Sequence, residues 1–308
     1  MVTTRARTLE SPLARARFSE AASWLSALGE SARPRQWPKN LLVFAAPLAS
    51  ASLGRDEGFG YALGAGAAFV AASVAVYLLN DVIDADRDRR HPVKRFRPVA
   101  AGRLPAPHAI ALGSVLGAAA VSFGFWFGQP MLAAVIAVYL ALSILYTLVF
   151  KHVAVIELTF VAFGFVLRAL AGAVATSVPP SGSFLLVCSL GALMVVIAKR
   201  FAELLGLRDE AVAHRPVLRW YTRSVLRRSQ RLVAIVMLTA YLLWVAGQST
   251  AWMRAWHLAS AIPLAAALLR FDWLTGRAAD QPVEDLIVRD RLMACAELAW
   301  LLSFAIGL

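Results

Sequence analysis

Long runs of apolar residues recur along the whole chain, and they restrict its fold more than any other feature. A helix that crosses a bilayer needs about 20 predominantly apolar residues, and most of these runs approach that length. The runs are apolar throughout rather than alternating, which disfavours a β-barrel. Nine candidate spans lie at about 39–54, 60–82, 108–127, 130–149, 153–175, 183–205, 231–249, 255–273 and 291–308. The sequence therefore predicts an all-α integral membrane protein with about nine transmembrane helices.

The positive charges fall almost entirely on one side of this predicted topology. With the N-terminus in the cytosol and nine crossings, the outer loops contain only Arg55 and Arg254 of the 31 lysines and arginines. That asymmetry follows the positive-inside rule, so it predicts a multi-pass protein with a cytosolic N-terminus. The net charge of +12 also suits anionic lipids and phosphorylated substrates. Nucleic acid is disfavoured as a partner, because no soluble recognition module carries the basic residues.

The chain divides into a short tail and one large membrane domain. Residues 1–38 are rich in arginine and lack the apolar stretch that a signal peptide requires. We expect them to form a cytosolic or interfacial tail, followed by a transmembrane domain over 39–308. Glycines such as Gly64 and Gly113 permit close packing of helices, either within one chain or between copies of a homo-oligomer.

Three aspartates stand where the second candidate span leaves the membrane. Asp81, Asp84 and Asp88 are spaced i, i+3, i+7, so on a continuing helix they line one face. Their mutual repulsion is relieved well by a hard divalent cation, and Mg²⁺ typically binds one or two carboxylates together with substrate phosphates. The alternative is a solvated helix end with ordinary loop charges. Because ionisable residues at membrane depth are usually functional, we predict that all three are catalytic ligands of Mg²⁺.

Cations follow this acidic motif closely. Lys94, Arg95 and Arg97 would neutralise the charge that the metal does not, and Asn80 directly precedes the first aspartate. We expect Asn80 to orient the carboxylates, and the three cations to contact substrate phosphates. The whole pattern is typical of a diphosphate site at a membrane surface.

These residues also carry a family resemblance. The pattern Asn80-Asp81-x-x-Asp84-x-x-x-Asp88, followed by Lys94-Arg95-x-Arg97-Pro98 and Gly102, resembles the first Asp-rich motif of the UbiA family of intramembrane prenyltransferases. The resemblance implies a UbiA-like bundle of nine helices with a polar central cavity open to the cytosol and to lipid. It also implies cytosolic active-site loops and a bound Mg²⁺ that holds a diphosphate leaving group.

Four segments are most similar to one branch of that family, whose members make decaprenylphosphoryl-5-phosphoribose. The similarity implies transfer of a phosphoribosyl group from 5-phosphoribosyl diphosphate (PRPP) to a polyprenyl phosphate. It further implies a plasma-membrane location and an early step in making arabinan donors for the cell wall. The segments are RPRQWPKN over 33–40, HPVKRFRP over 91–98, FVLRALAG over 165–172 and AKRFAEL over 198–204.

The chain departs from the family where a second Asp-rich motif is expected, at the end of the sixth span. Lys199, Arg200 and Glu203 occupy that place. PRPP carries a second phosphate on ribose position 5, and Arg and Lys both bind phosphate well. We therefore predict that Lys199 and Arg200 bind this phosphate. The alternative is that both side chains merely flank the membrane, and that Glu203 forms a helical ion pair with Arg200.

Further candidate substrate contacts lie on the neighbouring segments. Arg168 lies deep in the fifth span, where a buried guanidinium needs an anionic partner from protein or ligand. Glu157 is eleven residues away, about 16 Å along the helix axis, and is not an obvious partner. Glu157 takes the place of a carboxylate that the family carries after the segment of Tyr146 and Lys151. Lys151 and Lys39 are candidate phosphate contacts, and Tyr146 is either a substrate contact or an interface anchor.

Two other functions remain open from the sequence. A prenyltransferase that moves a prenyl chain from a prenyl diphosphate to an aromatic acceptor would share the fold and the first motif. The missing second Asp-rich motif argues against it. A transporter of an anionic lipid or metabolite would also use charged residues within the membrane, but no paired broken helices are apparent.

Overall fold

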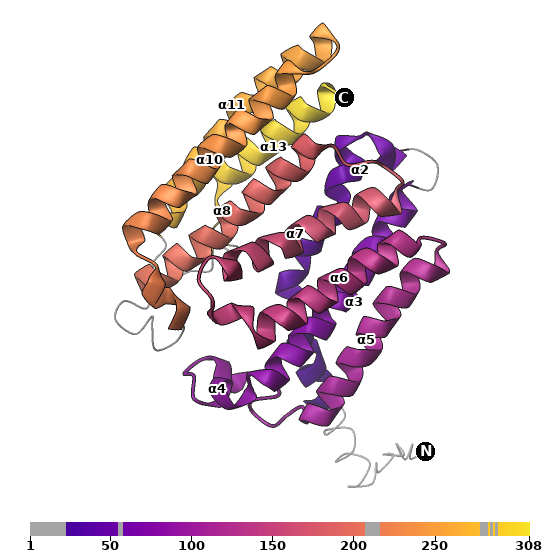
Figure 1. The fold of residues 1–308 in the computed structure, drawn as a ribbon, viewed down its shortest axis with the longest axis vertical. Helices are drawn as coiled ribbons and strands as arrows, with labels where there is room; N and C mark the ends of the chain where they lie inside the picture. Colours follow the sequence, from indigo (N-terminus) through magenta and orange to yellow (C-terminus); the bar gives the residue numbers. More distant parts are fainter. Residues whose placement is uncertain (1–22, 55–57, 207–215, 278–282, 284–285, 287–288) are drawn as a thin grey trace, which may run out of the picture. The chain divides into compact units, whose positions relative to one another are not determined.

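The computed structural model describes residues 23–54, 58–206, 216–277, 283, 286 and 289–308. Within that part of the chain every regular element is helical, as Figure 1 shows. Seven of the described helices are long and apolar enough to cross a membrane. They are α3 (Gly58–Ile83), α5 (Ala106–Trp126), α6 (Pro130–Leu148), α7 (Ile156–Ala175), α8 (Gly182–Gly206), α10 (Arg223–Ala246) and α11 (Ala251–Thr275). The predicted all-α integral membrane protein is confirmed.

The predicted count of nine spans is not confirmed, because the first and last expected spans differ from the rest. The first consists of short pieces, η1 (Pro34–Phe44), α2 (Ala45–Ala49) and η2 (Ser52–Gly54). Prolines at 38 and 47 each remove a backbone donor there and disfavour one long α-helix. The last is α13 (Arg291–Ile306), whose 16 residues extend about 24 Å. That length falls short of a hydrocarbon core about 30 Å thick.

The chain forms two compact units. Unit 1 joins residues 1–37, of which 23–37 are described, to 73–117. The predicted division into a tail over 1–38 and a membrane domain over 39–308 stays a prediction. Unit 1 contains a helical stretch over 23–32, the end of α3, α4 (Ala85–Arg89), η3 (Lys94–Phe96) and the start of α5.

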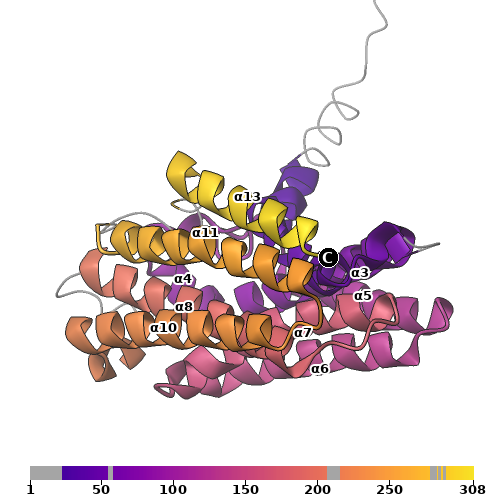
Figure 2. The same ribbon diagram turned by 90° about the horizontal axis from the view of Figure 1, so that it is seen from above.

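Unit 2 comprises residues 38–72 and 118–308. Its long helices pack mostly against their neighbours in sequence, α6 on α7, α7 on α8, α8 on α10 and α10 on α11. The last helix, α13, packs on α11, as Figures 1 and 2 both show. Buried apolar side chains of α8, α10 and α11 form one core, which includes Met194, Tyr241 and Phe271.

One glycine allows an unusually close approach within unit 2. A Cβ placed on Gly172 of α7 would lie 1.6 Å from the carbonyl oxygen of Val43 in η1. No other residue type fits there without moving one of the two backbones. Gly172 therefore seats η1 directly on α7, and this contact positions the polar residues that η1 carries.

Candidate active site

In unit 1, the end of α3 and the short helix α4 that follows it each carry one buried carboxylate. α3 stops at Ile83 and α4 starts at Ala85, but the helical hydrogen bonds continue across the junction. The N–H of Asp84 donates to the Asn80 carbonyl at 2.9 Å, and that of Asp88 donates to the Asp84 carbonyl at 2.8 Å. The spacing therefore acts as predicted for Asp81 and Asp88, which are 1% and 2% exposed. Asp84 is only half-buried.

Two arginines contact these carboxylates and form with them the Arg97 cluster (Arg33, Asp81, Asp88 and Arg97). Arg97 Nη1 lies 3.2 Å from Asp81 Oδ1 and 2.7 Å from Asp88 Oδ2, so one guanidinium bridges both acids. Arg33 Nη2 donates to the same Oδ1 of Asp81. The other oxygen, Asp81 Oδ2, is buried and has no hydrogen-bond partner among the described residues.

Arg33 is not among the site residues predicted from the sequence. Its backbone φ of +50° lies in the left-handed region and ends the helical stretch over 23–32. The guanidinium carbon lies 5.1 Å from the centre of the Tyr77 ring, a cation–π contact. Burial lowers the pKa of Arg33, but an arginine stays charged at neutral pH. The only sequence signal was its place at the start of the segment RPRQWPKN.

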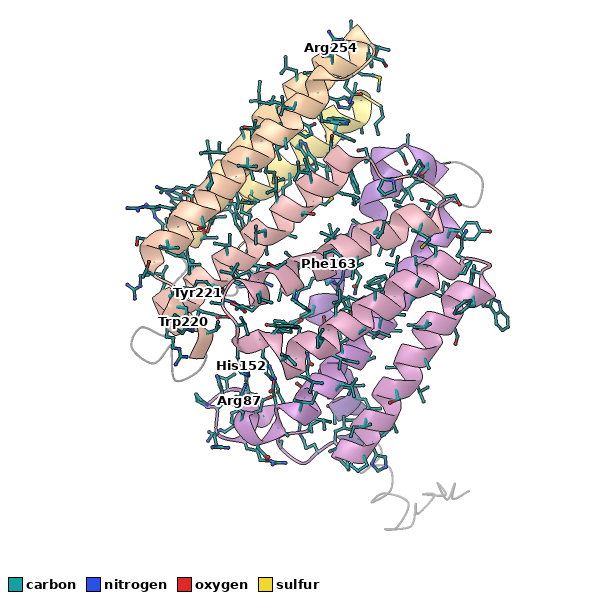
Figure 3. The ribbon with its side chains drawn as sticks, viewed as in Figure 1. Arg87, His152, Phe163, Trp220, Tyr221 and Arg254 are labelled. Carbon is teal, nitrogen blue, oxygen red and sulfur yellow. The ribbon has the colours of Figure 1, made fainter. Side chains whose placement is uncertain are left out.

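The other predicted residues of unit 1 differ in burial and in partners. Asp84 pairs with Arg87 at 3.8 Å; Arg87 is labelled in Figure 3. Lys94 is half-buried in η3, whereas Arg95 is exposed, with its guanidinium 4.8 Å from the Phe96 ring centre. Asn80 is half-buried in the last turn of α3.

The donor set of the Arg97 cluster suits a hard cation. Carboxylate oxygens are the ligands that Mg²⁺ prefers, and the buried Oδ2 of Asp81 is an acceptor with spare capacity. In the described part of the chain, no three acidic, histidine or cysteine side chains are already grouped as a metal site. The combination of all three aspartates as metal ligands therefore stays a prediction.

In unit 2, the predicted second site centres on a different arginine. Arg200 of α8 is 5% exposed, and its Nε donates to Glu157 Oε1 at 2.8 Å. Its Nη1 donates to Glu203 Oε1 at 2.6 Å, so the helical ion pair weighed above is present. These three residues form the Arg200 cluster, which ties α7 to α8. Lys199 beside it is half-buried, with Nζ 6.0 Å from the Phe165 ring centre.

The turn between α6 and α7 holds Glu157 in place. It contains η4 (Phe150–His152), and Val155 before α7 has a φ of +67°. The N–H of Val155 donates to the Tyr221 hydroxyl at 2.8 Å; Tyr221 follows η6 (Pro216–Trp220), and Figure 3 labels it beside the start of α7. The predicted contacts Tyr146, at the end of α6, and Lys151, in η4, are both half-buried here.

Arg168 is the centre of a separate polar contact within unit 2. Its Nε donates to Asn40 Oδ1 at 2.8 Å, its Nη2 to the Tyr139 hydroxyl at 2.9 Å and its Nη1 to the Gly164 carbonyl at 2.6 Å. As its separation along the helix suggested, Glu157 pairs with Arg200. Because Asn40 follows Lys39 in η1, Arg168 fixes the short helix that carries Lys39.

Comparisons with known proteins agree with this architecture. The sequence profile described as the UbiA prenyltransferase family matches residues 41–284. The chain is 40% identical to a decaprenyl-phosphate phosphoribosyltransferase of Mycobacterium tuberculosis, over 91% of this chain and 93% of the relative. It is 38% identical to the protein of the same name from Mycolicibacterium smegmatis, over 90% and 91% of the two chains.

A solved structure shares the fold at low sequence identity. It is a UbiA homologue from Archaeoglobus fulgidus bound to GPP and Mg²⁺, with a TM-score of 0.70 and 12% identity. The match covers 91% of this chain and 98% of that one. The profile covers most of the chain, and the mycobacterial relatives exceed 30% identity over nearly their full length. The chain belongs to the UbiA prenyltransferase family.

Proposed function

We propose that the chain transfers the 5-phosphoribosyl group of PRPP to the phosphate of a polyprenyl phosphate and releases diphosphate. The observation that carries this proposal is the identity of 38–40% to relatives named decaprenyl-phosphate phosphoribosyltransferase, over about nine tenths of the chain. The replacement of the family's second acidic motif by Lys199, Arg200 and Glu203 supports it from the residues themselves.

The Arg97 cluster is our candidate for the diphosphate end of the donor. Asp81, Asp84 and Asp88 would hold Mg²⁺, which when bound supplies charge to stabilise the departing diphosphate. The spare, buried oxygen of Asp81 supports this role. Lys94, Arg95 and Arg97 would then supply further positive charge to the phosphate oxygens.

The reaction itself makes limited demands on the protein. An oxygen of the acceptor phosphate attacks ribose C1, and the bond from C1 to the diphosphate oxygen breaks with its electron pair leaving on the diphosphate. The acceptor is already an anion at neutral pH, so no strong general base is needed. The residues of the site act by holding both reactants in line and by stabilising charge on the leaving group.

The Arg200 cluster is our candidate for the 5-phosphate end. Because Arg200 is engaged by Glu157 and Glu203, we assign the direct phosphate contact to Lys199. Arg200 would position Lys199 by fixing α8 against α7. Other predicted contacts, to which we assign supporting roles in substrate binding, are Lys39, Tyr146, Lys151 and, through η1, Arg168.

A membrane fold suits the lipid acceptor. Moving a polyprenyl chain out of the bilayer costs about 0.8 kcal/mol for each CH₂ group, so the enzyme must work at the membrane. We propose the plasma membrane, with the reacting groups on the cytosolic side where the basic residues gather. The product would supply arabinan donors for the cell wall.

A donor test decides this proposal. Purified protein in detergent, with Mg²⁺ and polyprenyl phosphate, is given radiolabelled PRPP. A parallel reaction is given radiolabelled prenyl diphosphate and a panel of aromatic acceptors. We expect label from PRPP to enter the organic phase only when Mg²⁺ is present. Label that moves only from prenyl diphosphate would establish a prenyltransferase instead, and no transfer in either reaction would favour a transporter.

A further inference from the structure

We propose that Arg33 is a further substrate-binding residue of the donor site. Without a metal ion, Arg33 forms an ion pair with Asp81. When Asp81 binds the divalent cation, Arg33 contacts the diphosphate of the donor instead. This inference rests on the proposed function, because it assumes a diphosphate donor and a cation at Asp81. The N-terminal segment, expected from the sequence to be a tail, would thereby supply a working part of the site.

The backbone at Arg33 directs this side chain towards the acids. Its φ of +50° belongs to the left-handed region, where glycine is the residue without strain and where helices often end. An arginine at such a position is strained, and strained residues of this kind cluster at functional sites. Here the strained residue reaches the buried carboxylate of Asp81 and lies over the Tyr77 ring.

The charges of the cluster explain why a second arginine is needed. Arg33 and Arg97 together balance Asp81 and Asp88, and both arginines donate to one oxygen, Asp81 Oδ1. Once the carboxylates bind a divalent cation, the two guanidinium groups lose their anionic partners. A diphosphate carries more negative charge than one divalent cation neutralises, and arginine binds phosphate oxygens through its planar fork. Arg33 and Arg97 can therefore exchange carboxylate for diphosphate.

The segment that carries Arg33 is held by contacts other than the one with Asp81. Arg103 donates to Glu30 Oε1 at 2.8 Å and also to Oε2. The same guanidinium donates to the Phe96 carbonyl at 2.9 Å. Arg33 can thus change its anionic partner while its backbone stays in place.

The variant Arg33→Gly tests this role and spares the fold. Glycine removes the guanidinium and also relieves the left-handed strain, so we expect normal expression and thermal stability. In the absence of substrate, the variant should bind the probe Mn²⁺ about tenfold more tightly, because one neighbouring charge changes the affinity of a carboxylate for a proton by that much. The KM for PRPP should rise about tenfold, because the diphosphate loses a charged hydrogen-bond donor.

The measurements use the full chain in detergent, with free Mn²⁺ counted by electron paramagnetic resonance and turnover followed with labelled PRPP. Arg90→Ala is the matched control: it removes an exposed arginine of unit 1 whose Nε donates to the Asp86 carbonyl. Both constants should keep their wild-type values in that variant. Arg33→Lys retains the charge but not the fork, so Mn²⁺ affinity should stay near wild type while KM for PRPP rises in part.

The outcomes separate this inference from the proposed function. Tighter Mn²⁺ binding together with a higher KM supports the inference, because a merely structural residue would not move the two constants in opposite senses. Unchanged or weaker Mn²⁺ binding in Arg33→Gly overturns it and leaves the metal site standing. Wild-type protein that binds no Mn²⁺, or Asp81→Asn that binds it normally, overturns the metal site itself and the inference with it.

Discussion

The Arg97 cluster and the Arg200 cluster are built alike and differ in their access to solvent. In each, one guanidinium bridges two carboxylates from different helical elements or turns. The Arg97 side chain is 29% exposed, whereas the Arg200 side chain is 6% exposed and that of its partner Glu157 is fully buried.

Because of that difference, we expect the Arg97 cluster to exchange ion pairs for ligand contacts and the Arg200 cluster to hold two helices together. A partly exposed guanidinium can leave its carboxylate for a ligand or for water more easily than a buried one, because water can replace it. Removing one member of a fully buried pair leaves an uncompensated charge and costs about 3–5 kcal/mol. We therefore assign ligand chemistry to the Arg97 cluster and helix positioning to Arg200.

The largest effect on activity is expected when the Arg97 cluster loses the charge of Asp81. Asp81→Asn keeps the shape of the side chain but removes the charge, and kcat/KM should fall about 10²–10³-fold or more, as it does when one electrostatic contact to a transition state is lost. Thermal stability should change little. Asp86→Asn, which alters an exposed acid paired with Arg89, is the control and should retain activity. An inactive Asp81→Asn that also fails to fold would make the acid structural and erase the contrast between the clusters.

The next effect concerns stability rather than turnover. Arg200→Met leaves the buried Glu157 without its cation, so the free energy of unfolding should fall by about 3–5 kcal/mol. Arg97→Met is the matched change in the partly exposed cluster and should cost less, because Asp81 keeps Arg33 as a partner and water can reach the place that Arg97 leaves. Thermal unfolding in detergent, followed by tryptophan fluorescence, measures both.

Restoring the neutral state of the Arg200 cluster provides a check. If the loss comes from orphaned charge, adding Glu157→Gln and Glu203→Gln to Arg200→Met should recover much of the stability. Equal losses in Arg97→Met and Arg200→Met would show that burial does not distinguish the two clusters.

A smaller effect is expected for Lys199, which is next to the Arg200 cluster and is our candidate contact for the 5-phosphate. Lys199→Ala should raise KM for PRPP about tenfold, the size expected for one charged hydrogen bond. The KM for polyprenyl phosphate and the thermal stability should change much less. A larger effect on the lipid than on PRPP would contradict our assignment of Lys199 to the 5-phosphate.

Local spacing predicted much of the Arg97 cluster and little of what joins distant segments. Asp81 and Asp88 share one side because helical hydrogen bonding continues through Asp84, which the i, i+7 spacing anticipates. Arg33 lies 48 residues from Asp81 and reaches it through a left-handed turn that the residue type did not signal. Likewise, the pair of Glu203 and Arg200 follows from i, i+3 spacing, whereas the bond from Arg200 to Glu157 spans 43 residues.

For the fold, too, local sequence patterns predicted more than contacts between distant segments. Continuous apolar runs predicted the seven long helices, because burial in lipid requires each run to satisfy its own backbone hydrogen bonds. The expected count of nine spans is not confirmed at the two ends of the membrane domain. There the described residues form short pieces around Pro38 and Pro47 and a helix of 16 residues, α13, which is shorter than the other long helices.

The smallest effect concerns the pair that holds the N-terminal segment near the Arg97 cluster. The Arg103 guanidinium holds the pKa of Glu30 below its ordinary range. A carboxyl with a lowered pKa in the folded state contributes stability above its unfolded pKa of about 4.3, and loses it as pH falls through the folded value. Because both side chains are largely exposed, Glu30→Gln should cost less than about 1 kcal/mol at pH 7.

The gap in thermal stability between wild type and Glu30→Gln should therefore close as the pH is lowered from 5 towards 3. Arg103→Ala should show a similar gap at pH 7, and the double variant should lose little more than either single one, because both remove the same pair. A gap that persists at pH 3 would assign the effect to packing. A gap this small leaves the left-handed turn and the cation–π contact with Tyr77 to keep Arg33 at the site when its anionic partner changes.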